Sequence, residues 1–461
     1  MRRARHDCIV VGAGPAGCAS AMTLARWGRN VLLVHDGQGT NHVFEETILD
    51  GAFPRLSAMG LGRIIEEPEW QGTSEHAVIW GSDELRLREQ PQGRHPGLKV
   101  NRKAFDERLR TEAIAAGAKE VEARVLSIQG TETPHIVTTA GVLSAQTIIC
   151  CTGRRTTSRL LSMHEKTVGP LTVAMTALSP LNESDRDRTL IEAVRDGWFW
   201  RLPRGDGQLA ITLFADLQTT RDGNRDTWNR ACRDAISWPR NTTFLPTATT
   251  VFVPRLRAGP DGVFLAGDAA SSADPLSSQG IEKALFSAEE AAYAANTALE
   301  TTISKSDLNG HLQHHEHGLF ELHKRQTAEW YRRETRFEDA PFWKTRQTAT
   351  EVNDAPGPLP SLMVKTPNLS TAQILVRENC VLTPLDGYTS GTHAPIARIG
   401  PHGVSTLLEL FEHPQTLQGA GALASKNPMH VAFRPSTLRS ACRTLFEFGL
   451  IKDASAQQDA Q

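Results

Sequence analysis

The N-terminal region alternates between short apolar runs and a longer Ala- and Leu-rich stretch. Residues 8–11 and 31–34 are wholly apolar, which predicts two buried strands. Residues 16–27 predict a helix that ends at Gly28, a residue type that often follows the last helical turn. Strand, helix and strand within about 30 residues form a βαβ unit, and such a unit requires a parallel sheet.

The middle of the chain predicts more of this sheet and then a second one. Short apolar runs at residues 148–151 and 263–266 predict further buried strands. Between them, three segments have the composition of strands in a separate antiparallel sheet: residues 172–178, 208–214 and 249–254. Helices are predicted at three further places: residues 104–117, 280–300 and 307–348. The fold class is therefore α/β, with a Rossmann-like domain and an antiparallel-sheet domain.

The last hundred residues differ in character from the rest. A proline-rich linker is predicted over residues 351–364, followed by a small, mostly helical and winged-helix-like domain over 365–461. From residue 351 onward there are eight Lys plus Arg and nine Asp plus Glu, so no basic face is expected and nucleic-acid binding is not predicted. A docking module for a protein partner, or a structural cap, fits this composition better.

These boundaries predict how the rest of the chain is divided. Residues 1–165 and 259–350 form the Rossmann-like domain with its long helices. Residues 166–258, with part of 70–100, form the antiparallel sheet expected to face the substrate.

Composition narrows the class of protein. The formal net charge of −2 gives no general affinity for polyanions. No run approaches the roughly 20 apolar residues of a membrane span, and the apolar run after the basic N-terminus is too short for a secretion signal. Seven cysteines occur without a C-x-x-C pair, which predicts reduced thiols and no metal site. We therefore expect a cytoplasmic protein.

The first candidate binding motif is a G-x-G-x-x-G turn between the first strand and the first helix. It consists of Gly12, Ala13, Gly14, Pro15, Ala16 and Gly17. Its three glycines allow a tight turn, close approach of a diphosphate and close packing of the helix on the strand. The helix N-terminus offers free N–H groups to the phosphates. The acidic residue expected after the second strand is displaced: His35 occupies that place and Asp36 follows, so either could bind the ribose, and we favour Asp36.

A second motif separates FAD from NAD as the cofactor. Gly267-Asp268 follows the predicted strand at 263–266, about 250 residues after the glycine turn. An NAD domain needs no second motif at such a distance, whereas the longer FAD needs a carboxylate for its ribityl chain. The two motifs together predict FAD.

Here the sequence resembles the FAD-dependent aromatic monooxygenase and tryptophan halogenase superfamily, over about residues 6–345. The resemblance implies a glutathione-reductase-type FAD domain in which Asp268 bonds the ribityl 3′-hydroxyl. It also implies that Pro275, Ser277, Ser278 and Gln279 lie beside the isoalloxazine, where the helix opened by Gly280 and Ile281 directs its positive end at the flavin.

Two more cofactor contacts are implied by the same resemblance. The segment from Lys99 to Leu109 matches a family segment whose arginine, here Arg102, contacts FAD. A helix cap with solvated basic residues is the alternative. Val125 would line the adenine through its backbone.

A tryptophan motif adds candidates for the substrate pocket. Trp198-Phe199-Trp200-Arg201-Leu202-Pro203 resembles the W-x-W-x-I-P motif of flavin-dependent tryptophan halogenases. Alternation along a strand places Trp198 and Trp200 on one face. That face holds an aromatic substrate or, equally, forms an aromatic core.

Two departures from the family pattern change the expected reaction. The halogenases use a lysine between the glycine turn and the Arg102 segment, and there is none between Gly17 and Leu98. Their catalytic Glu and halide-binding Thr are replaced by Ser277 and Gln279, so we predict no halogenation. The D-G motif that serves NADPH in single-component hydroxylases has lost its Asp in Cys151-Thr152-Gly153-Arg154, which favours an external flavin reductase or other reductant.

What remains is a monooxygenase that uses O₂ and hydroxylates an aromatic ring through a flavin C4a-hydroperoxide. Within the superfamily the chain resembles the monooxygenases that mature quinohemoprotein amine dehydrogenase. That likeness implies a protein or peptide substrate bearing tryptophan, modified during tryptophylquinone cofactor biogenesis. The alternatives are a small-molecule aromatic hydroxylase, a halogenase, a reductase of the geranylgeranyl type, and a non-catalytic flavin-binding docking protein. No catalytic acid or base is assigned.

Overall fold

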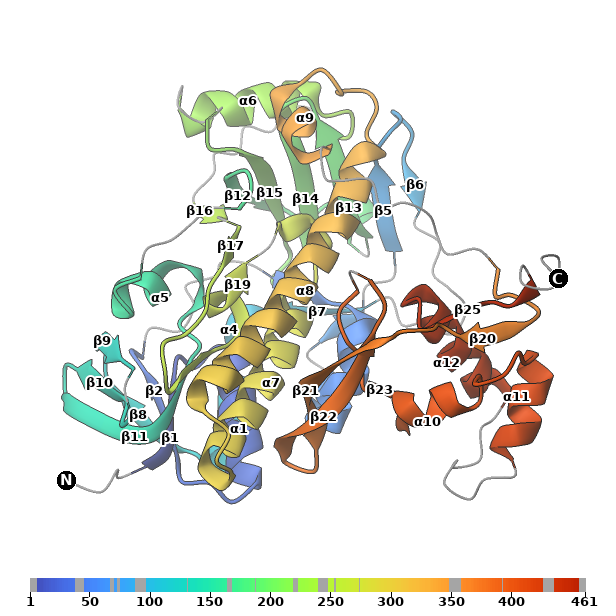
Figure 1. Cartoon of the computed structure of the whole chain (residues 1–461). Coiled ribbons are helices and arrows are strands. Elements are labelled where there is room, and N and C mark those ends of the chain that lie inside the picture. The colour runs from blue at the N-terminus through green and yellow to red at the C-terminus, as the bar shows by residue number, and fades with distance from the viewer. Residues whose placement is uncertain are drawn as a thin grey trace. The chain divides into compact units, whose positions relative to one another are not determined.

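The computed structural model describes the following residues: 6–37, 45–66, 70–72, 75–87, 97–130, 132–163, 168–186, 188–218, 223–238, 248–252, 254–272, 274–347, 358–391, 393–425 and 435–455. The chain divides into two compact units, Met1–Thr350 and Glu351–Gln461. Figure 1 shows their elements. Most of the predicted linker, residues 351–357, lies outside the described residues.

The first unit is built on a seven-stranded mixed sheet with the order β8-β2-β1-β11-β10-β9, and β18 pairs with β11 on the edge opposite β1. The strands are β1 (His6–Val11), β2 (Val31–His35), β8 (Lys119–Glu122), β9 (Val125–Gln129), β10 (His135–Thr138), β11 (Gly141–Cys150) and β18 (Val263–Leu265). β1, β2, β8, β11 and β18 are parallel, and β9 and β10 add an antiparallel extension. The predicted α/β class is confirmed.

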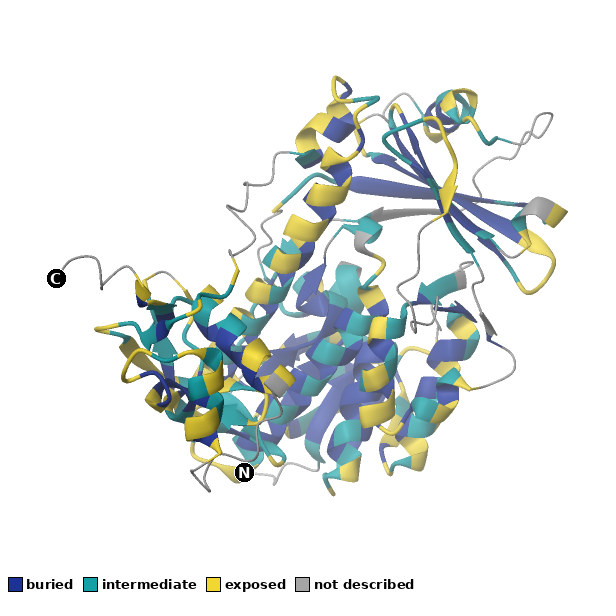
Figure 2. Ribbon diagram, turned by 90° about the vertical axis from the view of Figure 1, so that its right-hand side faces the viewer, coloured by how far each residue is buried: buried dark blue, intermediate teal, exposed yellow. Residues whose placement is uncertain are grey.

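Helices cover the parallel strands, and their caps explain where they begin. They are α1 (Pro15–Arg26), α4 (Arg102–Ala115), α5 (Gly153–Leu160), α7 (Gly280–Glu300) and α8 (Lys305–Arg332). α1 packs against α4 and α7. Asn101 caps α4 by accepting from the N–H of Ala104 at 3.1 Å, and Ser304 caps α8 by accepting from Asp307. Figure 2 shows the sheet buried between these helices.

A second sheet of seven strands has the order β16-β12-β15-β14-β13-β5-β6. Its strands are β5 (Glu75–Ile79), β6 (Arg86–Leu87), β12 (Thr172–Pro180), β13 (Arg188–Val194), β14 (Gly197–Pro203), β15 (Gln208–Asp216) and β16 (Ala248–Phe252). All neighbours are antiparallel except β5 and β13, which run parallel. One face packs Phe199 against Trp228 of α6 (Asn224–Asp234), and the other packs Trp198 against Tyr331 and Trp343.

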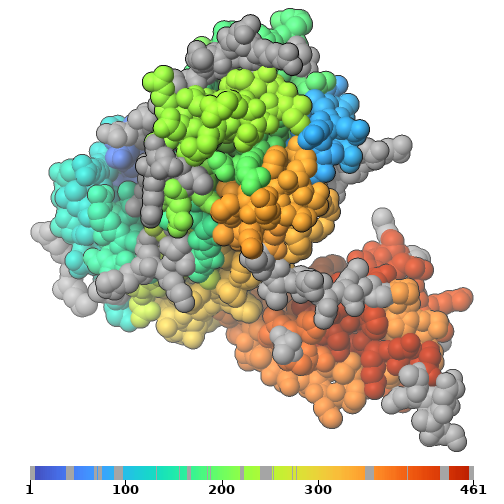
Figure 3. Space-filling model, turned by 90° about the horizontal axis from the view of Figure 1, so that it is seen from above, coloured from blue at the N-terminus to red at the C-terminus, as the bar shows by residue number. Residues whose placement is uncertain are grey.

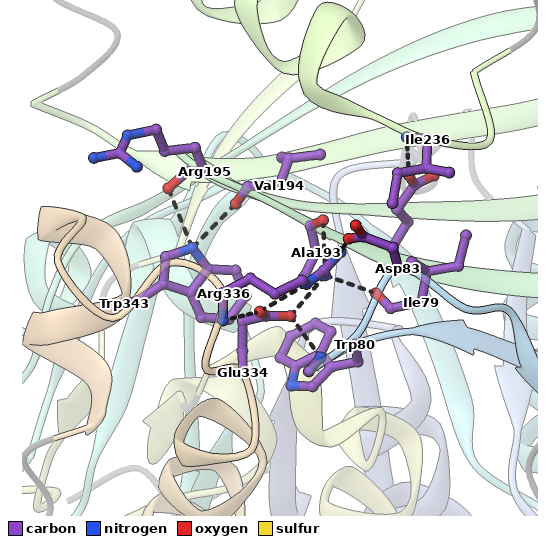
Figure 4. A network of polar contacts seen from close by, with 12 residues as sticks. Ile79, Trp80, Asp83, Ala193, Val194, Arg195, Ile236, Glu334, Arg336 and Trp343 are labelled. Carbon is purple, nitrogen blue, oxygen red and sulfur yellow. Dashed lines mark hydrogen bonds and ion pairs between the residues drawn. The ribbon is translucent and has the colours of Figure 1, made fainter.

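The helix expected over residues 307–348 is two helices. α8 ends at Arg332 and α9 (Pro341–Gln347) begins at a proline, because proline favours the first turn of a helix and cannot continue one. Polar contacts hold the intervening segment against the second sheet (Figure 4): buried Glu334 accepts from Arg336, whose guanidinium reaches Asp83 at 2.9 Å. Figure 3 shows the β5–β6 hairpin in light blue beside this segment in orange.

Smaller elements complete the first unit. A three-stranded sheet joins β3 (Glu45–Ile48), β7 (Leu98–Asn101) and β4 (Gln71–Gly72), with η1 (Asp50–Ala52), α2 (Phe53–Ala58) and α3 (Gly62–Ile65) nearby in the chain. β17 (Arg255–Leu256) pairs with β19 (Ser271–Ser272). Short 3₁₀ turns lie at η2 (Glu183–Asp185), η4 (Gly267–Ala269) and η5 (Pro275–Ser277).

The second unit combines helices with three strand pairs. Its elements are β20 (Met363–Lys365), β21 (Ser370–Glu378), β22 (Val381–Thr389), β23 (Arg398–Ile399), β24 (His402–Gly403), α10 (Val404–Glu409), α11 (Leu417–Ala424), α12 (Pro435–Glu447) and β25 (Ile451–Asp453). Leu407, Phe411 and Leu445 lie in its core. The unit contains helices, as expected, but the long β21–β22 hairpin was not predicted, because its strands show no regular alternation of buried and exposed residues and Pro384 weakens the strand pattern.

Two expectations from composition can be compared with the structure. All seven cysteines are free thiols, and burial raises the pKa of Cys8 to about 12, so this thiol is neutral at physiological pH. Among the described helices, none is both long and apolar enough to cross a bilayer.

Candidate FAD site

The register of the first sheet brings the two cofactor motifs together. Val11, Cys150 and Leu265 lie side by side at the carboxyl ends of β1, β11 and β18. The turns that follow these strands therefore meet at one edge of the sheet, where ligands of α/β proteins bind. A Cβ atom added to Gly267 would lie 2.8 Å from the Cβ of Ala16, so the two motifs, about 250 residues apart in the chain, are in contact.

The three glycines of the first turn have different surroundings. A Cβ at Gly12 would lie 2.5 Å from the carbonyl oxygen of Cys151, and a Cβ at Gly17 would lie 1.7 Å from that of Gly12. These two positions need glycine for the packing of the fold itself. A Cβ at Gly14 would meet no described atom within 4 Å, and no side chain caps α1. Space and N–H donors therefore remain at the start of α1, as a bound diphosphate requires.

Asp268 lies in η4, directly after β18. Gly267 adopts a φ of 62°, a left-handed conformation that favours glycine, and it turns the chain so that the Asp268 side chain is 36% exposed. Its carboxylate lies 3.7 Å from Arg154 Nε and 3.6 Å from Lys283 Nζ. An accessible carboxylate with two cations beside it fits the predicted hydrogen bond to a ribityl hydroxyl.

A buried polar cluster, which was not predicted from the sequence, holds the Gly267 peptide. Lys283 of α7 donates to the carbonyl oxygen of Gly267 at 3.1 Å and to the hydroxyl of Ser271 at 3.2 Å. Ser287 accepts from the Gly267 N–H at 3.0 Å and donates to Glu316 of α8, which also accepts from Ser271 at 2.7 Å. We call these four side chains, Lys283, Ser271, Ser287 and Glu316, the Gly267 clamp.

The two charged residues of the Gly267 clamp are linked through a serine, and Lys283 also lies near the Asp268 carboxylate. Lys283 and Glu316 are 4% and 6% exposed, and Ser271 links them by hydrogen bonds to both. Burial and the charge of Lys283 lower the pKa of nearby His323 to about 4, so this histidine is neutral at physiological pH. A sequence signal exists: Lys283, Ser287 and Glu290 follow one another at i, i+4 and i+7, so one face of this Ala-rich helix is polar.

The loop before α7 carries the residues predicted beside the flavin. We call residues 274–280 the front loop. Asp274 accepts from the Leu276 N–H at 3.0 Å, Pro275 opens η5, and Ser278 has a φ of 52°. Gln279 Oε1 is buried and has no hydrogen-bond partner among the described residues, so it can accept a bond from a ligand. The side chain of Ser277 lies outside the described residues.

The end of the front loop is open. A Cβ added at Gly280 would meet no described atom within 4 Å, and Gln279 makes no side-chain cap to α7. Ile281 is buried behind it. The start of α7 therefore presents space and N–H groups, as it must if it is to lie beside a flavin ring.

Both tryptophans of the W-x-W motif face the same aromatic cluster. Trp198 is 2% exposed, stacks on Phe214 with ring centroids 4.0 Å apart, and donates its indole N–H to the Tyr331 hydroxyl at 3.3 Å. Trp200 is partly buried and packs against the same cluster. The aromatic-core alternative therefore describes Trp198, and Trp200 is the more accessible of the two.

Arg102 forms hydrogen bonds with two carboxylates of the protein. Its guanidinium bonds Glu46 at 2.7 Å and Asp106 at 3.2 Å. Burial works against its charge, but the two carboxylates prevail and raise the pKa of Arg102. Its predicted contact with FAD would use the remaining N–H groups. Val125 begins β9 and packs against the core of the first sheet.

Arginines surround the segment in which the D-G motif has lost its aspartate. The Arg154 guanidinium lies 4.0 Å above the Phe252 ring as well as near Asp268. Arg257 donates to the carbonyl oxygens of Asp268 at 3.2 Å and Arg154 at 3.1 Å. Two arginines, Arg154 and Arg257, therefore lie at the edge of the site beside the second sheet.

The contacts of His35 bear on which residue binds the ribose. Its Nδ1 accepts from the Gly37 N–H at 3.1 Å, and its Nε2 lies 2.7 Å from Glu120, so both ring nitrogens have partners. Asp36 is exposed at the end of β2.

We expect Asp36→Ala to raise the FAD dissociation constant roughly tenfold, the effect of one charge-assisted hydrogen bond, and His35→Ala to change it less. Titration of the apoprotein with FAD measures both, and a larger effect of His35→Ala would assign the ribose to the imidazole.

Sequence comparisons find related proteins and a family model that covers the part of the chain with the glycine turn. Residues 7–171 match the model of the lycopene cyclase protein family. The digeranylgeranylglycerophospholipid reductase of Methanosphaerula palustris is 26% identical, over 64% of this chain and 77% of its own. LodB of Marinomonas mediterranea, an FAD-dependent oxidoreductase, is 24% identical, over 76% of this chain and 99% of its own.

Two solved structures extend the likeness along the whole chain. The peptidyl tryptophan dihydroxylase QhpG, essential for tryptophylquinone cofactor biogenesis, aligns with a TM-score of 0.75 and 20% identity, over 97% of this chain and 100% of its own. The flavin-dependent halogenase CmlS aligns with a TM-score of 0.76 and 18% identity, over 98% of this chain and 97% of its own. The chain therefore has the fold of FAD-dependent oxidoreductases and flavin halogenases. The predictions of an oxidoreductase and of FAD as its cofactor are confirmed for this flavoprotein.

Proposed function

We propose that this flavoprotein is a monooxygenase that hydroxylates an aromatic ring, namely a tryptophan of a protein substrate. The observation that carries the proposal is the extent of its likeness to the peptidyl tryptophan dihydroxylase QhpG, which covers 97% of this chain and all of that one. The reductase from Methanosphaerula palustris matches over only 64% of this chain. The alignment that includes the C-terminal unit therefore favours the hydroxylase over the reductase.

The residues of the site fit FAD and support one orientation for it. The diphosphate would lie on the N–H groups at the start of α1, where Gly14 leaves space, and Asp268 would accept from a ribityl hydroxyl. The ring would lie at the front loop, within reach of Gln279 Oε1. When bound and reduced, FAD supplies the activation of O₂; the chain supplies binding, orientation and exclusion of water.

The residues that distinguish halogenases favour hydroxylation. The stretch between Gly17 and Leu98 contains no lysine, and Ser277 and Gln279 replace the acid and the halide-binding threonine of the family pattern. A small-molecule aromatic hydroxylase remains the second candidate, because the same site chemistry would serve a free aromatic ring. CmlS, a halogenase, shares the fold, so the choice between the reactions depends on these residues.

The reductant is proposed to be a separate flavin reductase. Arg154 stands in the segment where single-component hydroxylases carry the aspartate of their D-G motif, and it lies 3.7 Å from Asp268. Thr152 precedes Gly153 where the D-G motif has its aspartate, so that negative charge is missing from this segment. The NADPH contact of the single-component enzymes therefore has no counterpart in this segment.

Labelled oxygen tests the proposal. We expect reduced holoenzyme, incubated with a tryptophan-bearing peptide and isotopically labelled O₂, to add one or two labelled oxygen atoms to the indole. Tandem mass spectrometry locates them, and a peptide with phenylalanine in place of tryptophan is the matched control. A product that gains hydrogen without oxygen would favour the reductase, and a chlorine isotope pattern in chloride buffer would favour the halogenase.

A further inference from the structure

The hydroxyl of Tyr331 connects the W-x-W motif to the front loop. Tyr331 of α8 is 1% exposed and lies in the aromatic cluster beneath the second sheet. Its oxygen accepts from the indole N–H of Trp198 at 3.3 Å, and its O–H donates to Asp274, whose two carboxylate oxygens lie 2.9 and 3.1 Å away. A buried chain of hydrogen bonds thus runs from β14 to the first residue of the loop predicted beside the flavin.

Asp274 transmits this contact to the loop itself. Its Oδ1 accepts from the Leu276 N–H at 3.0 Å, which closes the first turn of η5. On the other side, Arg346 of α9 lies 3.7 Å from Asp274 and is fixed by Asp216 at 2.7 Å and Thr172 at 2.8 Å. Two strands of the second sheet, β12 and β15, therefore hold the partner of Asp274.

The charge of Asp274 depends on these neighbours. Burial raises the pKa of Asp274, while Arg346, the Leu276 N–H and the Tyr331 hydroxyl oppose this shift, and Asp216 adds to it. Burial also raises the pKa of Tyr331 well above its usual value, so its hydroxyl keeps the proton that it donates. Loss of the Tyr331 hydroxyl would leave the Asp274 carboxylate with fewer donors in a buried environment.

We propose that Tyr331 is a positioning residue, which uses its hydroxyl to fix Asp274 and thereby the conformation of the front loop against the bound flavin. The proposal rests on the placement of the flavin in the proposed function. In this proposal Trp198 acts indirectly, because its indole N–H orients the Tyr331 hydroxyl toward Asp274.

The test compares Tyr331→Phe, Asp274→Asn and the double variant in holoenzyme. Tyr331→Phe keeps the ring and removes one bond to a carboxylate, so we expect the FAD dissociation constant to rise roughly tenfold. The reduction potential of the bound flavin, measured against pH, is the second readout. Without the hydroxyl the pKa of Asp274 rises further. The change in potential that accompanies ionisation of Asp274 should therefore occur at a higher pH in Tyr331→Phe. In Asp274→Asn this change should be absent.

The double variant shows whether Tyr331 acts through Asp274. If it does, Tyr331→Phe adds nothing to Asp274→Asn in either readout. Additive effects, or an unchanged potential profile in Tyr331→Phe, would overturn the proposal. Trp343→Phe is the matched control, because its indole bonds the carbonyl oxygens of Val194 and Arg195 within the same cluster and makes no recorded bond to Asp274 among the described residues.

Both readouts use flavin alone, without substrate. If the potential responds as expected but no oxygenated tryptophan forms, the proposed function fails and the role of Tyr331 stands. If oxygenated tryptophan forms and Tyr331→Phe leaves the potential profile unchanged, the role of Tyr331 fails and the proposed function stands.

Discussion

Substitution of Gly14 by valine is expected to abolish FAD binding and leave the apoprotein folded. The side chain would enter space that is empty of protein, since a Cβ at Gly14 meets no described atom within 4 Å, but that space is where the diphosphate approaches the N–H groups of α1. We expect the FAD dissociation constant to rise roughly a thousandfold, about 4 kcal/mol. Flavin fluorescence during titration of the apoprotein measures the affinity, and circular dichroism measures the fold.

Two other glycines make this result specific. Gly318→Val, on the exposed side of α8, is the matched control: its added Cβ also meets no described atom within 4 Å, and FAD affinity should stay unchanged. Gly17→Ala should instead unfold or severely destabilise the protein, because its Cβ would lie 1.7 Å from a backbone oxygen. If Gly14→Val retained normal FAD affinity, the diphosphate could not lie at the start of α1.

Lys283→Met is expected to destabilise the apoprotein by about 3 kcal/mol, because it removes a buried cation that is linked through Ser271 to the buried carboxylate of Glu316. It also removes a donor to the Gly267 carbonyl and should therefore weaken FAD binding through Asp268. Urea unfolding of the apoprotein measures the first effect without the added stability that a bound cofactor provides.

A second substitution separates charge from packing at this cluster. Glu316→Gln removes the buried anion, so adding it to Lys283→Met should recover part of the lost stability. Lys344→Met, at an exposed position of α9, is the matched control and should change stability by less than about 0.5 kcal/mol. Equal destabilisation by Lys283→Met and Lys344→Met would show that the Gly267 clamp contributes nothing.

The first sheet and the FAD motifs could be predicted because their signals are local. A wholly apolar run at 8–11, followed by Gly12, Gly14 and Gly17, indicates strand, turn and helix without knowledge of any distant residue. Gly267-Asp268 after a buried strand is a signal of the same kind. The structure then supplied what the chain order could not show, namely that the register of β1, β11 and β18 brings these turns into contact.

The residues that could not be predicted act through contacts between distant elements. Glu316 and Tyr331 lie on a long, mixed-polarity helix, and no pattern around them indicates that one reaches Gly267 through Ser287 and the other reaches Asp274. The tryptophan motif shows the same limit: alternation placed Trp198 and Trp200 on one face, but only packing shows that Trp198 is enclosed.

The most direct test of the account compares the binding of FAD and FMN to the apoprotein. If the diphosphate lies on α1 while Asp268 holds the ribityl chain of the same molecule, FAD should bind at one per chain and far more tightly than FMN, which lacks the second phosphate and the adenosine. Asp268→Ala should weaken both. Equal affinity for FAD and FMN, or no uptake of either, would contradict the account.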